Sequence, residues 1–385
     1  MDQEKFIKNF DIIVKKFKNY KNFKDLSIES IEDIQKIPLS TKDDLQNFKI
    51  EDCPTQPVAI WNTSGSSGNV TLIGVSQQSY NRFIKRADLF NEKYLGPFKE
   101  GRKKITNVIE MYTDHYFIDR GFSVLSSGRA LLDEEEIDFF AKRVSIAKPN
   151  ILIGPPSFIY SILTRLKERS FIDILFIGGQ MVTKSFIENL SQMVDAKLVE
   201  TYCFTEYPEL TVRDPLKDEY FEVVPNEEVY LEVMDLKGNF SNQGKGRLII
   251  SDLDNDSYPI IRYLVGDVVE LKEEDGKRFI KVFGRADSYI KINQDLINKD
   301  EIKNNILDIL AHDEYLVKIN NEKDTLVDSI EICLKEEDIN KKDRINFFIN
   351  DHFDISPTFQ ELNEPIKTNR RGKNINVIDL RININ

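Results

Sequence analysis

Apolar residues recur at helical spacing near the N-terminus. Phe6, Phe10, Ile13 and Phe17 lie on consecutive turns of a helical wheel, with polar residues between them. This pattern predicts an amphipathic helix over residues 4–20 that covers an apolar core.

A second segment carries a helix start signal. Ile37-Pro38-Leu39-Ser40 leads into Thr41-Lys42-Asp43-Asp44-Leu45. A threonine before a short acidic run is a preferred helix N-cap, so the segment predicts a turn followed by a capped helix.

Strand-like and helix-like segments alternate between residues 58 and 202. Apolar β runs occupy 58–61, 70–75, 105–111, 151–153, 172–177 and 198–202. Helical periodicity occupies 77–94, 134–147, 156–169 and 184–194. Such alternation predicts βαβ units, with helices packed on a largely parallel sheet.

The pattern changes after residue 220. Short β runs at 229–234, 246–251, 268–271 and 279–283 predict a β-rich subdomain appended to the α/β body. Beyond Gly284-Arg285-Ala286-Asp287, we expect strands at 289–292, 315–319 and 329–334 and helices at 299–310 and 336–350. The predicted fold class is α/β, with a large N-terminal domain (1–284) and a small C-terminal α+β domain (288–385).

Composition and charge narrow the class of protein. The chain has 385 residues, is 41% hydrophobic and carries a net charge of −12, which disfavours nucleic-acid and anionic-membrane partners. It has no apolar run long enough to span a bilayer and no signal-peptide pattern at its start. The three cysteines and three histidines form no disulfide framework and no metal-ligand spacing. A reduced, cytoplasmic protein is the expectation.

The loop before residue 70 combines hydroxyl side chains with glycines. Residues 62–69 spell Asn-Thr-Ser-Gly-Ser-Ser-Gly-Asn. Glycines allow a backbone nest of N–H groups, and hydroxyls add donors, so the loop is suited to phosphate oxygens. It is not a Walker P-loop, because no lysine follows the glycines. A solvent loop is the alternative.

Two further segments place acidic residues beside strands. Glu200 to Glu206 follows a predicted strand, at the edge where parallel sheets bind ligands. Thr205 offers a hydroxyl to a phosphate, Glu206 a hard oxygen to Mg²⁺, and Tyr202 a flat face to a base. In Tyr258 to Asp267, we expect Asp267 to end a strand and to accept hydrogen bonds from a ribose diol. An ordinary turn and a strand cap are the alternatives.

The last two segments are basic. Gly284-Arg285-Ala286-Asp287 predicts a hinge at the domain boundary with a cation facing a nucleotide. Arg371-Gly372-Lys373-Asn374 places a mobile point charge near the C-terminus. A polar linker and a solvated turn are the alternatives.

The order of these motifs is more specific than any one of them. They run as the loop at 63–68, Tyr202-x-x-Thr205-Glu206, Arg262-Tyr263-x-x-Gly266-Asp267, Gly284-Arg285-x-Asp287 and Gly372-Lys373. This order resembles the adenylate-forming superfamily of acyl-CoA synthetases, nonribosomal adenylation domains and luciferases. The segments 37–45, 259–263 and 372–379 make the chain most similar to the phenylacetate-CoA ligase-like branch. The resemblance runs from residue 35 to residue 381.

The sequence departs from the family pattern at several positions. Gly68-Asn69-Val70-Thr71 stands where the family has Gly-x-Pro-Lys, and Cys203 replaces a glycine. Leu264 and Val265 replace the usual Arg-Thr, and the glycine expected near Asn293-Gln294-Asp295 is missing. These changes thin the contacts to pyrophosphate and leave the acidic and lysine positions in place.

The resemblance implies a two-step reaction. A carboxylate attacks the α-phosphate of MgATP to give an acyl-adenylate, and a thiol of CoA or of a carrier-protein phosphopantetheine then takes the acyl group. A small carboxylic acid is the implied substrate, and the aromatic residues of the expected acyl pocket favour an aryl acid.

The resemblance also implies roles for individual residues. The residues that would bind the β- and γ-phosphates are Thr63, Ser64, Gly65, Ser66, Ser67 and Gly68. Thr205 would hold the α-phosphate and Glu206 the Mg²⁺. Tyr202 would contact the adenine together with the turn Gly178, Gly179 and Gln180. Asp267 and Arg285 would bind the ribose. Lys373 would bridge the carboxylate and the α-phosphate, and Asp287 would be the hinge of a mobile C-terminal domain.

An acyl pocket is expected after two strands. Tyr112 and His115 follow one strand and Gly154 ends another, so both segments should open near the site. Aromatic crowding there favours a flat acid, although an ordinary core has the same composition.

Two alternative functions stay open. One is a stand-alone adenylation enzyme that acylates a carrier protein, another protein or an amine without CoA. The other is a non-catalytic, nucleotide-binding relic of the fold, which the eroded loop favours and the retained Glu206, Asp267 and Lys373 disfavour.

Overall fold

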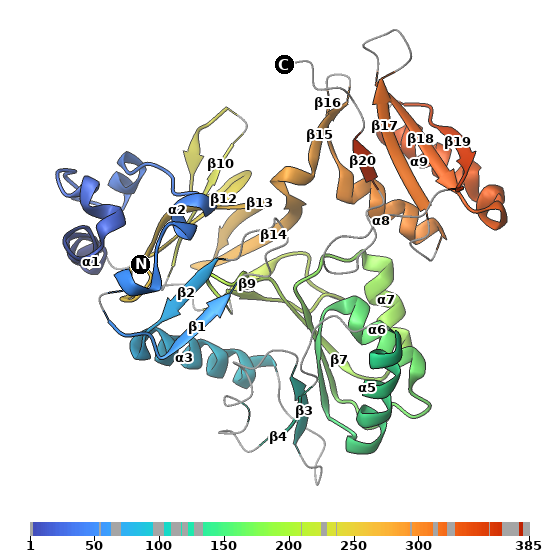
Figure 1. Ribbon diagram of the computed structural model, residues 1–385, viewed down its shortest axis with the longest axis horizontal. Coiled ribbons are helices and arrows are strands. Elements are labelled where there is room, and N and C mark those ends of the chain that lie inside the picture. Colours follow the sequence, from blue (N-terminus) through green and yellow to red (C-terminus); the bar gives the residue numbers. More distant parts are fainter. Residues whose placement is uncertain are drawn as a thin grey trace. The chain divides into compact units, whose positions relative to one another are not determined.

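The computed structural model describes most of the chain. The described residues are 3–53, 55–62, 71–94, 104–108, 117, 122–126, 134–208, 210–224, 229–235, 237–292, 295–310, 315–321, 328–353, 355–363 and 377–379. Contacts divide the chain into two compact units (Figure 1). The first comprises Met1–Met181 and Glu188–Phe283, and the second comprises Val182–Ile187 and Gly284–Asn385.

The predicted N-terminal amphipathic helix forms, but it ends at Lys16 instead of residue 20, because Phe17 is extended. Helix α1 (Gln3–Lys16) buries Phe6, Phe10 and Ile13, and a 3₁₀ helix, η1 (Lys18–Phe23), continues the chain. Two further 3₁₀ turns, η2 (Glu32–Lys36) and η3 (Ile50–Asp52), follow.

The predicted capped helix is confirmed as α2 (Lys42–Gln46). The hydroxyl of Thr41 accepts from the backbone N–H of Asp44, and the Asp44 carboxylate accepts from the backbone N–H of Thr41 at 2.7 Å. This reciprocal pair is a capping box, which satisfies two otherwise unpaired donors at the helix start.

A five-stranded parallel sheet has the order β4-β3-β5-β6-β7. Its strands are β3 (Ile105–Val108), β4 (Ser123–Ser126), β5 (Ile151–Gly154), β6 (Ile174–Gly178) and β7 (Lys197–Thr201). The helices of this region are α3 (Gln77–Tyr94), α5 (Glu134–Ala147), α6 (Pro156–Arg165) and α7 (Lys184–Met193).

The parallel sheet is covered by α3 on one face. Phe90 of α3 packs in one cluster with Ile151, Ile174 and Val199 of the three adjacent strands β5, β6 and β7. Helices α5 and α6 pack against each other beside β5 and β6 (Figure 1). Burial on both faces explains why these strands are nearly continuous apolar runs.

One predicted strand arrangement is wrong. Strands β1 (Ala59–Asn62) and β2 (Leu72–Val75) do not join the parallel sheet but form an antiparallel hairpin of their own. The segment between Asn62 and Leu72 is shorter than the dozen or more residues that a parallel crossover needs.

Two further predicted helices differ from their expected bounds by several residues. The helix expected over 156–169 ends at Arg165, because Leu166 is extended with a ψ of 126°. The helix expected over 336–350 begins as a 3₁₀ helix, η6 (Glu336–Lys341), and becomes α9 (Lys342–Phe353).

A seven-stranded sheet forms the predicted β-rich part, in the order β11-β10-β12-β13-β14-β9-β8. Its strands are β8 (Thr211–Val212), β9 (Phe221–Val223), β10 (Tyr230–Met234), β11 (Phe240–Ser241), β12 (Gly244–Asp252), β13 (Ile260–Glu274) and β14 (Lys277–Arg285). Strand β13 is far longer than the run predicted at 268–271.

The segment 37–40 is fastened to β13 by Arg262. The buried guanidinium of Arg262 donates to the Ile37 carbonyl at 2.6 Å and pairs with both carboxylate oxygens of Glu232. Ser40 donates its N–H to the Arg262 carbonyl at 2.9 Å, and its carbonyl accepts from Leu264 at 2.9 Å. The segment 37–40 and the start of β13, which are far apart in the sequence, are therefore held together by hydrogen bonds.

The second unit has its own sheets and core. The four-stranded sheet β19-β18-β17-β20 consists of β17 (Tyr315–Asn321), β18 (Asp328–Leu334), β19 (Thr358–Glu361) and β20 (Val377–Asp379). Its core includes Ile306 of α8 (Lys299–Leu310), Val317, Ile332 and Ile349. A separate hairpin pairs β15 (Tyr289–Ile292) with β16 (Asp295–Asn298), preceded by η5 (Ala286–Ser288).

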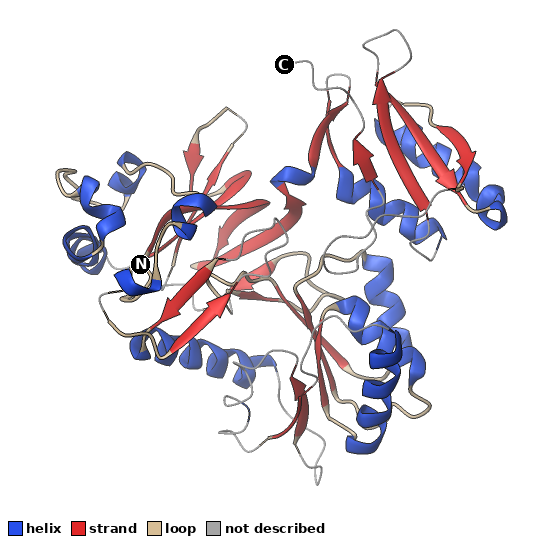
Figure 2. Cartoon of the chain, in the orientation of Figure 1, coloured by secondary structure: helices blue, strands red, loops and turns tan. Residues whose placement is uncertain are grey.

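Figure 2 shows helices and strands in both units. The predicted fold class is confirmed: a large α/β part with an appended antiparallel sheet is followed by a small α+β part. In the part of the chain that the structure describes, no helix is both long and apolar enough to cross a membrane.

Candidate functional site

Three neighbouring strands of the parallel sheet end at the same edge. In register, Gly154 of β5 lies beside Ile177 of β6, and Gly178 at the end of β6 lies beside Thr201 at the end of β7. The carboxyl ends of parallel strands are where open α/β sheets bind ligands. This edge therefore collects Gly154, Gly178 and the segment after Thr201.

The glycines at this edge have local reasons to be glycine. A Cβ on Gly178 would lie 2.7 Å from Cγ2 of Thr201, so β6 and β7 approach too closely for any side chain. Gly179 has a φ of +71°, and apart from its chain neighbours no atom of the described residues would lie within 4 Å of a Cβ there. Gln180 follows and accepts a hydrogen bond from the Ser157 hydroxyl at 2.7 Å. The turn is thus shaped by backbone geometry, with open space over Gly179.

An ion pair anchors the strand that leads into the site. Glu200 and Arg213 exchange backbone hydrogen bonds, and their side chains form an ion pair at 2.6 Å. Burial raises the pKa of the Glu200 carboxyl, while the nearby guanidinium acts in the opposite direction. The pair fixes the end of β7 against the segment around β8.

Tyr202 and Asp267 are joined directly. The Tyr202 hydroxyl donates to Oδ2 of Asp267 at 2.6 Å. The Tyr202 backbone is fixed on both sides by the Thr211 hydroxyl, which accepts from the Tyr202 N–H at 3.1 Å and donates to its carbonyl at 2.7 Å. The structure therefore brings together a residue predicted to face adenine and a residue predicted to hold ribose.

The expectation that Asp267 ends a strand is wrong. Asp267 lies inside β13, directly after Gly266, which has a φ of +92°. The pairing of β13 with β12 shifts register here, between Arg247 and Ile249 of β12, which marks a β-bulge. The bulge, rather than a strand end, exposes Asp267 to Tyr202.

Glu206 lies in a buried polar position on the same side. Glu206 is 8% exposed, and its Oε1 accepts a hydrogen bond from the Tyr263 hydroxyl at 3.1 Å. Thr205 precedes it in the turn and is partly buried. The turn and β13 are thus connected twice, through Tyr202–Asp267 and Tyr263–Glu206.

A small cavity adjoins Glu206. Its volume is about 20 Å³, and its lining includes Trp61 of β1, Ile73 of β2 and Arg86 of α3. The Arg86 guanidinium lies 4.5 Å from the ring centroid of Tyr207, which also lines the cavity. Since Trp61 and Ile73 belong to the hairpin whose loop is 63–70, that hairpin and Glu206 border the same space.

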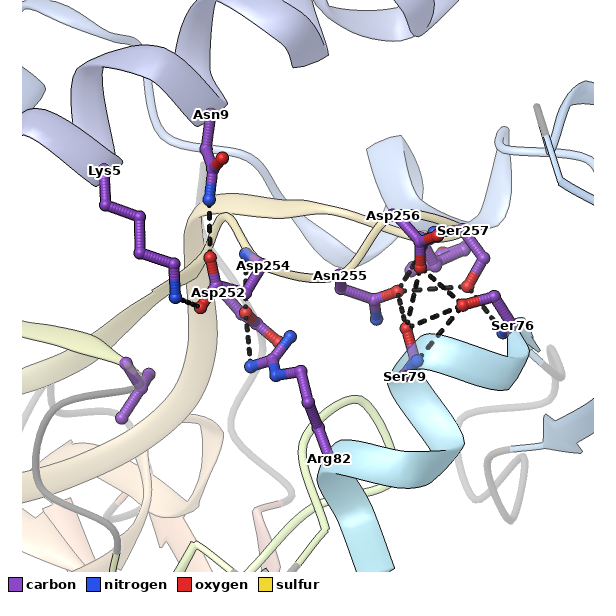
Figure 3. Close-up of polar contacts among 12 residues, drawn as sticks. Lys5, Asn9, Ser76, Ser79, Arg82, Asp252, Asp254, Asn255, Asp256 and Ser257 are labelled. Carbon is purple, nitrogen blue, oxygen red and sulfur yellow. Dashed lines mark hydrogen bonds and ion pairs between the residues drawn. The ribbon is translucent and has the colours of Figure 1, made fainter. Parts of the chain in front are cut away.

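Asp252 and Asn255, which also line the cavity, belong to a segment held by polar contacts to α3 (Figure 3). Arg82 of α3 donates to Oδ1 of Asp252 at 3.0 Å, and the Ser79 hydroxyl donates to Asn255 at 2.8 Å. Ser257 accepts from the Ser76 N–H at 2.9 Å and donates to the Gly74 carbonyl at 2.8 Å. These contacts tie the start of α3 to β2 and to the segment between β12 and β13.

Several predicted site residues lie outside the described residues. They are the loop residues Thr63, Ser64, Gly65, Ser66, Ser67 and Gly68, the pocket residues Tyr112 and His115, and Lys373. Of Asp287 only the backbone is described, in η5, and Arg285 is an exposed residue at the end of β14. Phe117, near the expected acyl pocket, is buried in the core cluster under α3, 5.4 Å from the ring of Phe122.

Tyr263 and Arg262 contribute contacts at the candidate site that their place in the motif did not predict. Both lie in the segment compared with the family motif, and their contacts depend on partners far away in the sequence: Glu206 for Tyr263 and Glu232 for Arg262. Motif spacing alone carries no signal for such pairs.

The donors present fit magnesium bound together with a nucleotide. Among the described residues, no three His, Cys, Asp or Glu side chains gather as a metal site. Mg²⁺ is usually held by one or two carboxylates plus substrate phosphates rather than by an all-protein cage. A single carboxylate, Glu206, with one oxygen engaged by Tyr263, suits that mode.

No protein-family model and no curated protein sequence matches the chain. Solved structures do match. 2-Hydroxyisobutyryl-CoA ligase in the postadenylation state with 2-HIB-AMP is 14% identical, and the match covers 98% of this chain and 89% of that chain with a TM-score of 0.73.

Two further structures cover a smaller share. The amide bond synthetase McbA from Marinactinospora thermotolerans is 13% identical over 80% of this chain and 66% of that one, with a TM-score of 0.58. The anthranilate CoA ligase AuaEII with anthranoyl-AMP is 15% identical over 82% and 65%, with a TM-score of 0.57. The chain therefore has the fold of these two ligases and of this synthetase.

Proposed function

We propose that this chain is an AMP-forming ligase that activates a small carboxylic acid and transfers it to a thiol. In the first step, a carboxylate oxygen bonds to the α-phosphorus of ATP and the bond to pyrophosphate breaks. In the second step, a thiol sulfur bonds to the acyl carbon, AMP leaves, and the thiol proton passes to solvent. The observation that carries the proposal is the pairing of Tyr202 with Asp267 and of Tyr263 with Glu206 at one edge of this fold.

The first step joins two anions, so catalysis depends on charge neutralisation and positioning. Glu206 would hold Mg²⁺, which when bound neutralises phosphate charge. Thr205 would orient the α-phosphate, and the loop at 63–68 would hold the β- and γ-phosphates. Lys373 would bring its charge to the point where carboxylate and α-phosphate meet.

The nucleoside would lie at the strand ends. Tyr202 offers an aromatic face, and the Asp267 carboxylate that its hydroxyl orients would accept a hydrogen bond from a ribose hydroxyl. The open space over Gly179 suits a flat base beside the turn Gly178-Gly179-Gln180. Arg285 would add a cation on the ribose side, and Asp287 would be the hinge of the C-terminal domain.

We further propose an aryl acid as substrate and CoA or a carrier-protein phosphopantetheine as acceptor, within a phenylacetate-CoA ligase-like branch. The aromatic residues near Tyr112, together with His115 and Gly154, support a flat acyl pocket. The similar structures include ligases named for an aliphatic and for an aromatic acid, so the substrate panel must contain both.

The experiment is carboxylate-dependent ATP–pyrophosphate exchange across aryl, hydroxy, fatty and amino acids. We expect exchange with an aryl acid, none without acid, and a large loss in Glu206→Gln. Absence of exchange with every acid would favour the non-catalytic, nucleotide-binding alternative.

The acceptor needs a separate assay. Product formation from the best acid is compared with CoA, a carrier protein and simple amines. An amine product without a thioester would favour the alternative adenylation enzyme, a possibility supported by the similarity to an amide bond synthetase.

A further inference from the structure

We propose that Tyr263 is a positioning residue for Glu206, and that Tyr202 and Tyr263 form a reciprocal clamp on the two site carboxylates. This inference rests on the proposed function, because it concerns how Glu206 is prepared to bind Mg²⁺ with ATP.

The clamp consists of two equivalent hydrogen bonds that run in opposite directions between two segments. The turn supplies Tyr202 and Glu206, and β13 supplies Tyr263 and Asp267. Each tyrosine donates to the carboxylate of the other segment, at 2.6 Å for Tyr202 to Asp267 and at 3.1 Å for Tyr263 to Glu206. Rotation of either carboxylate therefore breaks a contact between the two segments.

Two backbone irregularities of β13 lie directly before the clamp residues Tyr263 and Asp267. Arg262, directly before Tyr263, has a φ of +46°, and Gly266, directly before Asp267, has a φ of +92°. The pairing with β12 shifts register at both places. A bulge redirects the side chains beside it and is frequent next to functional sites. A non-glycine residue at positive φ is strained, so the surrounding contacts must hold Arg262 there.

These contacts involve the side chain of Arg262 and the backbone on both sides of Tyr263. Glu232 holds the Arg262 guanidinium in a fully buried pair, and Ser251 accepts from the Arg262 N–H at 2.9 Å. Ser40 bonds to the Arg262 carbonyl and the Leu264 N–H, so the backbone on both sides of Tyr263 is fixed. The Tyr263 ring is thereby directed toward Glu206 before any ligand binds.

A tyrosine is chemically suited to this task. Its hydroxyl is a neutral donor, so it orients a carboxylate without cancelling the negative charge that a cation needs. The Tyr263 hydroxyl donates to Oε1 of Glu206, so the contact that orients the carboxylate adds no positive charge to it. A lysine or arginine in its place would compete with the cation, and phenylalanine would leave a buried carboxylate with one donor fewer.

The test is Mg²⁺ dependence of ATP binding, measured by calorimetry without acid so that no turnover occurs. In Tyr263→Phe, we expect the half-saturating Mg²⁺ concentration to rise roughly tenfold or more, the usual range when a hydrogen-bond partner of a metal ligand is lost. ATP binding without Mg²⁺ should stay near wild type. Glu206→Gln should shift in the same direction, and the double variant should add little to it, since both changes act through one carboxylate.

Tyr20→Phe is the matched control. Tyr20 is a buried tyrosine whose hydroxyl donates to the Pro259 carbonyl at 3.0 Å, next to the start of β13, and not to a carboxylate. It should lose similar thermal stability without changing the Mg²⁺ dependence. Equal Mg²⁺ dependence in Tyr263→Phe and wild type would overturn the positioning role and leave the proposed function standing. A wild-type chain that binds no ATP at any Mg²⁺ concentration would overturn both.

Discussion

The two units differ in what their interiors are made of. Of the buried polar and charged residues in the described part of the chain, only Asn298 and Asp338 lie in the second unit. The first unit buries many, including Glu206, Glu232, Arg262 and Asp267. The core of the second unit is instead aliphatic and aromatic, built from β17 and β18 with α8 and α9.

The partners of these buried groups also differ. Asp338 pairs with Lys341 on the next turn at 2.9 Å, a contact within one segment. In the first unit, Arg262 reaches Glu232 and Ile37, and Tyr263 reaches Glu206. A buried polar group is costly unless it is paired, so long-range pairs fix the relative positions of distant segments. The first unit therefore uses polar contacts to position the residues of the candidate site, whereas the core of the second unit is mainly apolar.

Breaking the central polar pair should have the largest effect on stability. Arg262→Met leaves Glu232, which is 0% exposed, without its cation, and removal of one partner of a buried pair costs about 3–5 kcal/mol. Urea denaturation should show this as a lower midpoint. The control is Arg262→Met with Glu232→Leu, which should recover part of the loss because no charge stays unpaired. A single variant as stable as wild type would contradict the structural role of the pair.

The second unit should tolerate loss of its predicted catalytic residue without unfolding. Lys373→Ala should lower ATP–pyrophosphate exchange roughly 10²–10³-fold, the range for loss of one preorganised charge-stabilising group. Thiolysis of a supplied acyl-adenylate and the melting temperature should stay near wild type. Lys342→Ala, an exposed lysine at the start of α9, is the control and should leave both half-reactions unchanged. Exchange within a few-fold of wild type in Lys373→Ala would refute its assignment.

The hinge prediction separates the half-reactions. Asp287→Pro fixes φ near −65° and should prevent a backbone change at η5, so exchange survives while thioester synthesis falls roughly 10²-fold through misplacement of the second unit. Asp287→Ala is the control, because it removes the carboxylate and keeps the backbone free. If the proline variant loses both steps equally, Asp287 is a linker residue and no hinge.

Local signals predicted much of the fold. The helices expected at 77–94, 134–147 and 299–310 have those bounds in the structure. Amphipathic period and capping act within a few turns, so a single segment contains the information. The position of β1 and β2 depends instead on which strands pair across the chain, and there the prediction was wrong.

The sequence predicted which residues belong to the candidate site but not which of them contact each other. Motif order singled out Tyr202, Glu206 and Asp267, which the structure brings together. The strand end expected at Asp267 was wrong because β13 continues through a bulge at Gly266. The roles of Arg262 and Tyr263 depend on residues brought near by tertiary folding, and no local spacing encodes them.

The smallest effect should come from trimming apolar cores. Ile332 of β18 and Ile280 of β14 are both fully buried strand residues, one in each unit. Changing either to valine removes one methylene and should cost roughly 0.5–1.5 kcal/mol of unfolding free energy. Exchange activity and its Mg²⁺ dependence at 25 °C should stay at wild-type values in both variants, because neither isoleucine has a polar contact to the site. A loss of exchange in Ile280→Val with none in Ile332→Val would mean that apolar packing in the first unit, and not its buried polar pairs, positions Glu206 and Asp267.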